Sequence, residues 1–82
     1  MSNEIANAAI SDMQKLRAGM DSLRLNIAAN QNAIRHWGGN PSYAIETRMA
    51  ERRIERARRE LAVLVAEADD ILAMHEENAA TA

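Results

Sequence analysis

The chain has 82 residues, ten of them Lys or Arg and twelve Asp or Glu, with a formal net charge of −2 and no cysteine. This length allows a single domain, and the charge balance argues against nucleic-acid binding by the whole surface while leaving room for a local basic patch. The lack of cysteine excludes disulfides, thiolate metal sites and a cysteine nucleophile. The polar start and the lack of an apolar run of about 18 residues predict neither a signal peptide nor a membrane span, so we expect a cytoplasmic protein.

A heptad pattern predicts a first helix over residues 4–37. Its seam, the positions that repeat in steps of three and four, holds Met13, Leu16, Met20, Leu23, Ile27, Asn30, Ile34 and Trp37. Asn30 is the one polar residue among them, and it either lies buried and fixes the register or is solvated. Gly19 lies inside the helix, where glycine costs about 1 kcal/mol relative to alanine, so we expect it to mark a close neighbour.

Residues 38–41, Gly-Gly-Asn-Pro, predict the turn between two helices. We expect Gly38 or Gly39 to take the left-handed conformation that ends a helix, Asn40 to cap the next helix, and Pro41 to occupy its first position. A connection this short joins antiparallel neighbours.

A second heptad pattern predicts a helix over residues 42–78, followed by a frayed tail over residues 79–82. Its seam reads Tyr43, Thr47, Ala50, Ile54, Ala57, Leu61, Leu64, Ala68, Ile71 and His75. Folding at the turn places Leu64 near Leu16 and Tyr43 near Trp37. The predicted fold is therefore all-α, with two long antiparallel helices forming one coiled-coil-like helical hairpin domain over residues 1–82.

The hairpin has more apolar and uncharged surface than one helix pair can cover. The outer face of the first helix lacks the charges expected of a solvated face. Four residues represent this face: Ala18, Ser22, Leu25 and Ala29. Val65 and Leu72 lie off the seam of the second helix. Because no third helix remains, we expect self-association through these residues into a homodimer or a larger helical bundle.

Charge is unevenly distributed along the second helix. Residues 48–60 contain an arginine row of Arg48, Arg52, Arg53, Arg56, Arg58 and Arg59, whereas residues 67–77 contain five acidic residues and no Lys or Arg. This order opposes the helix macrodipole. The row could clamp phosphates or an acidic protein surface. It could also be a solvated face with internal pairs such as Glu55 with Arg59, or meet the acidic segment of a neighbouring copy.

His36, Trp37 and Tyr43 cluster at the hairpin tip, as a contact patch for a partner or as a plug that closes the end of the hairpin. His36 and His75 lie at opposite ends of the hairpin, so we expect no metal site. With no Gly-rich phosphate loop and no Asp/His/Ser arrangement, we expect no cofactor and no enzymatic activity.

The expected function is non-enzymatic binding, in which the arginine row and the tip grip an acidic or apolar surface of another protein and block or scaffold it. The alternative is that arginines from several copies bind a nucleotide or nucleic acid. We expect no membrane partner.

Trp37-Gly38-Gly39 between two helices of similar length resembles the layout of the WXG100 family, which implies a small secreted helical hairpin. That family usually has a Tyr-x-x-x-Asp/Glu export signal after its second helix, and no tyrosine follows the second helix here. The small, cysteine-free chain rich in Ala and Arg also resembles accessory proteins of phages or mobile elements, such as inhibitors of host defence.

Overall fold

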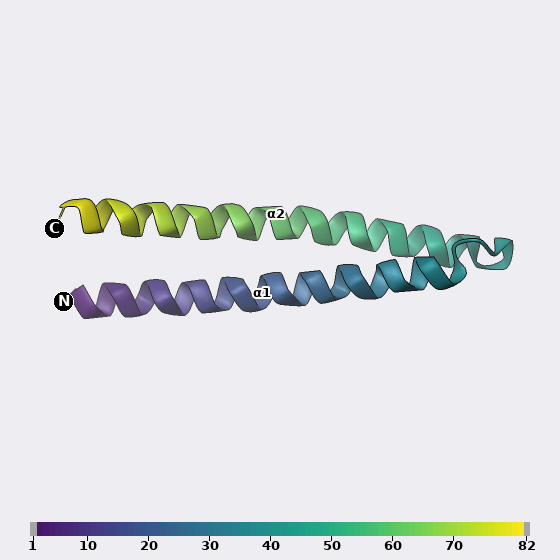
Figure 1. Cartoon of the computed structure of the whole chain (residues 1–82), viewed down its shortest axis with the longest axis horizontal. Coiled ribbons are helices and arrows are strands. Elements are labelled where there is room, and N and C mark those ends of the chain that lie inside the picture. Colours follow the sequence, from purple (N-terminus) through teal and green to yellow (C-terminus); the bar gives the residue numbers. More distant parts are fainter. Residues whose placement is uncertain (1, 82) are drawn as a thin grey trace.

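The computed structural model describes residues 2–81, and it describes side-chain burial for residues 7–77. Two long helices, α1 (Ser2–Trp37) and α2 (Ala44–Thr81), are joined through a short 3-10 helix, η1 (Pro41–Tyr43). They run antiparallel and pack against each other as a hairpin of 62 × 16 × 13 Å, with the first turn of α1 and the last turn of α2 far from the hinge (Figure 1). The predicted all-α hairpin is confirmed. Neither α1 nor α2 contains a stretch apolar and long enough to cross a bilayer in its described residues.

The bounds of α2 differ slightly from those predicted. The prediction was a helix over residues 42–78 with a frayed tail over 79–82, whereas α2 begins at Ala44, after η1, and continues to Thr81. Ala79 and Ala80 favour this extension because alanine has the highest intrinsic helix propensity. Ala82 lies outside the described residues.

The hinge uses its glycines in a different way from the one predicted. Neither Gly38 nor Gly39 has a positive φ, so the expected left-handed helix end is wrong. Instead, the Gly38 N–H donates to the Ile34 carbonyl at 2.7 Å, which continues the helical pattern by one residue. A Cβ on Gly38 would lie 2.6 Å from that carbonyl oxygen, so the close approach of backbone requires glycine.

Asn40 and Pro41 behave as predicted. Asn40 has an extended backbone, and its Oδ1 accepts a hydrogen bond from the Ser42 N–H at 3.0 Å. Pro41 occupies the first turn of η1, where its missing N–H is not needed. The Tyr43 N–H then donates to the Asn40 carbonyl at 3.0 Å. This cap turns the chain back on itself and starts α2 beside the end of α1.

The core is a narrow strip along the predicted seam. Among residues 7–77, the buried apolar residues are Ala50, Ile54, Ala57 and Ala68, all on α2, and no large side chain is fully buried. On α1, seam residues such as Leu23 are partly buried. Three of the four buried residues are alanines, which let the two helices approach closely. The hairpin therefore holds together with a small core and a large surface.

Asn30 and Gly19, both on α1, show details of the helix interface. Asn30 is partly buried, and its Nδ2 donates to the backbone carbonyl and the side-chain Oδ1 of Asn26, at 2.8 and 2.7 Å. Its amide hydrogen bonds therefore stay within α1. Leu64 packs against Gly19, in the turn next to Leu16, the residue near which the sequence placed it.

Candidate functional site

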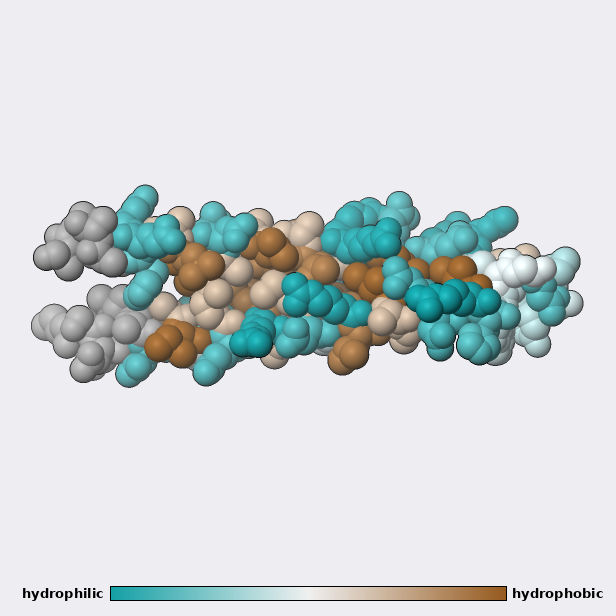
Figure 2. All heavy atoms as spheres, viewed as in Figure 1, coloured by the Kyte–Doolittle hydropathy of each residue, from teal (hydrophilic) through white to brown (hydrophobic). Residues whose placement is uncertain are grey.

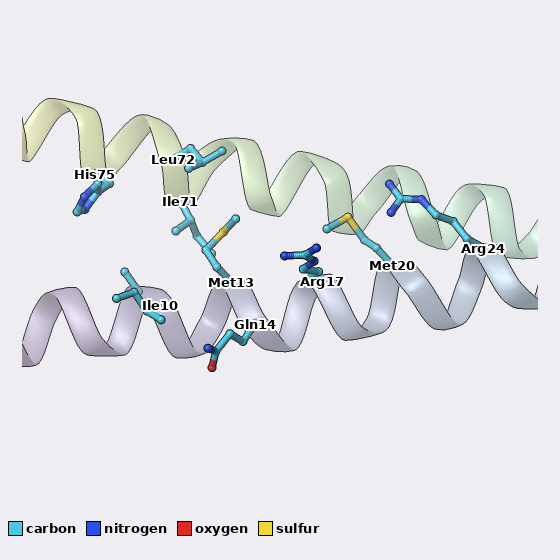
Figure 3. Close-up of a pocket in the computed structure, with 10 residues that line it drawn as sticks. Ile10, Met13, Gln14, Arg17, Met20, Arg24, Ile71, Leu72 and His75 are labelled. Atoms are coloured by element: carbon cyan, nitrogen blue, oxygen red, sulfur yellow. The ribbon is translucent and has the colours of Figure 1, made fainter.

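A groove lies at the open end of the hairpin, between α1 and the last half of α2. It has a volume of about 650 Å³. Met13, Met20 and Ile71 form its apolar floor, and in Figure 3 Met13 and Ile71 point toward one another across the space between the helices. Ile10 and Leu72 add apolar side chains that are 55% and 48% exposed. We call this hollow the open-end groove. Its apolar lining suits the apolar face of another helix.

Cationic and polar side chains border the open-end groove. Arg17 and Arg24 come from α1, and His75 comes from α2 (Figure 3). Arg24 forms an ion pair with Asp21 at 3.4 Å, in which both side chains are 58% exposed. Arg17 forms no ion pair with any described residue. Exposed pairs of this kind contribute little to stability, so both arginines remain able to meet an acidic partner.

The arginine row lies on the exposed surface of the first half of α2. All six of its arginines are exposed, and Figure 2 shows hydrophilic side chains covering much of the hinge half of the molecule in that view. Arg59 pairs with Glu55 at 3.7 Å, which confirms one of the predicted internal pairs. Arg48, Arg52 and Arg56 form no ion pair with a described residue, and the same holds for Arg53 and Arg58. Most of the row is therefore positive charge without a partner in the described hairpin.

Of the three residues predicted to cluster at the tip, Trp37 and Tyr43 are in contact. The rings of Trp37 and Tyr43 lie with their centroids 4.5 Å apart at an interplanar angle of 54°, which joins the end of α1 to η1. The two residues are still 46% and 39% exposed. His36 is not part of this stack: its Nδ1 lies 3.2 Å from the Asn32 carbonyl, one turn back in α1. The tip thus closes the hinge with one side and offers aromatic surface with the other.

The residues predicted for self-association are accessible. Ala18, Ser22, Leu25 and Ala29 are exposed on α1, with Leu25 at 73%, and Val65 and Leu72 are exposed on α2. Leu72 lines the open-end groove, whereas the four α1 residues do not. The predicted set therefore divides between two surfaces of the hairpin.

A smaller cavity of about 330 Å³ lies at the hinge. The backbone of residues 38–41 forms one side of it, and Thr47, Arg48 and Glu51 of α2 form the other. Thr47 Oγ1 is buried without a hydrogen-bond partner among the described residues. The cavity thus places the guanidinium group of Arg48 beside the backbone of the hinge, whereas the Thr47 hydroxyl is closed off from solvent.

No binding role was predicted for Arg17, Arg24 or Ile10. The available signal was their spacing of seven residues beside the seam of the first helix.

No group of three or more His, Cys, Asp or Glu side chains within the described residues is placed to hold a metal ion. Comparisons with known protein families, curated proteins and solved structures give no match.

Proposed function

We propose that this chain is a non-enzymatic interaction protein, a self-associating helical hairpin whose arginine row binds an acidic surface of a partner protein. The observation that carries this proposal is the exposed positive charge of the first half of α2, where five of six arginines have no ion pair with a described residue. Binding there would block or scaffold the partner. Arginine suits this role because its planar guanidinium binds carboxylates through two hydrogen bonds.

The size of the surface supports self-association. The hairpin exposes 6632 Å², whereas a compact monomer of 9.1 kDa exposes about 4,900 Å². Several of the excess exposed groups are large and apolar: Ile10, Leu25, Ile45, Met49, Val63, Val65, Leu72 and Met74. Covering part of this surface with another copy stabilises both by removing apolar area from water. We therefore propose a homodimer or a larger helical bundle.

The neighbours of the arginine row favour a protein as its partner. Ile45 and Met49, which are 74% and 46% exposed, lie among the arginines on α2. Exposed aromatic residues, Trp37 and Tyr43, lie at the adjoining tip. Arginine, methionine and aromatic side chains are enriched at protein interfaces.

A small anionic ligand is the second candidate, and the hinge cavity is the observation that favours it. Arg48 supplies a positive charge there, beside the backbone of residues 38–41. A phosphate group of a nucleotide or nucleic acid would pair with its guanidinium group.

Three fluorescent probes separate these functions: an acidic amphipathic peptide, a single-stranded oligonucleotide and an ATP analogue, each titrated at low and high salt. The test variant is Arg52→Glu with Arg56→Glu, and the control is Lys15→Glu with Arg35→Glu, which changes the same charge outside the row. We expect the test variant to weaken peptide binding at least about tenfold and the control to change it little. Binding of the phosphate probes that falls steeply with salt would favour the second candidate. Peptide binding that survives the Arg52 and Arg56 reversal contradicts a role for the row.

A further inference from the structure

We propose that the open-end groove binds α2 of a second copy, in a two-fold dimer whose hinges lie at opposite ends. This arrangement rests on the proposed self-association and specifies its interface. The occupant of the groove is the side of α2 that carries Val65 and Leu72, and it comes from the second copy.

The side chains that line this surface repeat every seven residues on both helices. On α1, Met13 and Met20 lie on the floor of the groove, and Arg17 and Arg24 lie on its border. Residues seven apart lie on the same side of a helix, about 10.5 Å apart along its axis. Each helix therefore presents pairs with the same axial spacing.

The acidic half of α2 presents the complementary pattern. Val65 and Leu72 are exposed apolar residues seven apart, and they are 39% and 48% exposed. Asp69 and Glu76, also seven apart, lie next to them on the outer side and are exposed. Neither acid forms an ion pair with a described residue. Apolar pairs and charged pairs thus alternate on α2 as they do on α1.

One alignment satisfies both patterns together. When α2 of a second copy lies parallel to α1, placing Val65 against Met13 also places Leu72 against Met20. The same alignment brings Asp69 to Arg17 and Glu76 to Arg24. The two-fold axis generates every contact twice, so the dimer contains four apolar contacts and four ion pairs of this set. Negative charge at the C-terminal end of a helix is unfavourable for the helix alone. In this dimer the acidic end of α2 binds arginines of the other copy.

The opposite orientation, with both hinges at the same end, is unfavourable. The contact between Gly19 and Leu64 fixes which residues of α1 and α2 lie at the same height. In that orientation it places Arg24 level with Arg58 and Arg59 of the second copy, so like charges lie at the same height. Opposed hinges avoid this repulsion and leave the hinge tips beyond the overlap.

Analytical ultracentrifugation of charge-reversed chains tests the contacts. Arg17→Glu with Arg24→Glu should raise the dimer Kd at least about tenfold, and Asp69→Arg with Glu76→Arg should do the same. Mixing the two reversed chains should restore a dimer, because positions 17 and 24 of each chain again meet opposite charges at positions 69 and 76 of the other chain. The control, Lys15→Glu with Asp70→Arg, changes exposed residues outside this interface and should leave the Kd within about twofold.

A spin label at the hinge tests the orientation. A Cβ on Gly39 meets nothing within 4 Å, so Gly39→Cys can carry a label, and the chain has no other cysteine. Opposed hinges predict a distance between labels of about 70 Å, at 1.5 Å per residue. Hinges at the same end would give a distance below about 30 Å, with the labels about the width of two hairpins apart.

The possible outcomes separate the dimer from its arrangement. A folded monomer at every concentration would overturn both the proposed self-association and this interface. A dimer with a short distance between labels, or with a Kd unchanged by charge reversal, would overturn this arrangement alone. The long distance together with rescue in the mixed sample supports it.

Discussion

Leu64 packs into the space beside Gly19: its Cδ1 lies 3.1 Å from the position that a Cβ on Gly19 would occupy. The absence of a side chain on α1 lets this leucine of α2 approach the backbone closely. From this contact toward the hinge, the helices hold the buried residues Ala50, Ile54 and Ala57. Toward the chain ends they separate, as Figure 1 shows, and the open-end groove occupies that part of the interface.

Substitutions at Gly19 should separate helix propensity from packing. Gly19→Ala gains up to about 1 kcal/mol of intrinsic helix stability, and the added methyl meets only the terminal carbon of Leu64, which can move by rotation about χ2. We expect this variant to be as stable as the wild type or more stable. Gly19→Leu should lower the free energy of unfolding by about 1–3 kcal/mol, because several added carbons cannot be accommodated against α2.

Urea denaturation followed by circular dichroism measures these differences. All variants must be compared at one protein concentration, because self-association makes the apparent stability depend on it. Equal stability of Gly19→Leu and Gly19→Ala would contradict the close approach of the helices at this point.

The two hinge glycines should respond differently to the same substitution. A Cβ on Gly38 would lie 2.6 Å from the Ile34 carbonyl oxygen, a backbone atom that cannot move without disturbing the end of α1. Gly38→Ala should therefore destabilise the hairpin by about 1–3 kcal/mol. Gly39 has open space and no positive φ, so Gly39→Ala should be neutral or stabilise by up to about 1 kcal/mol. Thermal unfolding of the two variants, measured side by side, provides an internal control, and the reverse order would show that the hinge differs from this description.

Most of the fold was predictable because it depends on local signals. The spacing of apolar residues gave the two helices, and Asn40-Pro41 gave the start of the second one. The backbone conformation of Gly38 was not predictable. Two reasons can place a glycine at a helix end, a positive φ or a lack of room for Cβ, and the sequence does not distinguish between them. The contact of Leu64 with Gly19 was not predictable either, since it depends on how the two helices fit together in three dimensions.

The candidate binding surfaces were predictable only in part. The exposed arginines and the contact between Trp37 and Tyr43 follow from their positions in the sequence. The open-end groove does not, because it arises where two helices of similar pattern separate. Arg17 and Arg24 resemble any charged residues beside a seam until the space between the helices is known.

The aromatic contact at the hinge should contribute measurable coupling energy. A double-mutant cycle of Trp37→Ala, Tyr43→Ala and the combined variant isolates the interaction of the two rings from their separate burial. We expect a coupling of about 0.5–1.5 kcal/mol, typical of aromatic pairs at the observed centroid distance of 4.5 Å. Guanidinium denaturation of the four proteins measures it. Additive effects of the two single substitutions would mean that the rings contribute through burial alone.

The alanines on the seam of α2 should be intolerant of larger side chains. Ala57 is 4% exposed, so Ala57→Leu has to displace α1 and should lower the free energy of unfolding by about 1–3 kcal/mol. Ala66→Leu makes the same chemical change at an exposed position of the same helix, and it should alter stability by less than about 0.5 kcal/mol. Urea denaturation of both variants at equal concentration gives the comparison. If both leucines were tolerated equally, the close packing of α1 on the alanines of α2 would not be what holds the hairpin together. A loss at Ala57 alone would show that the narrow alanine strip sets the distance between the helices.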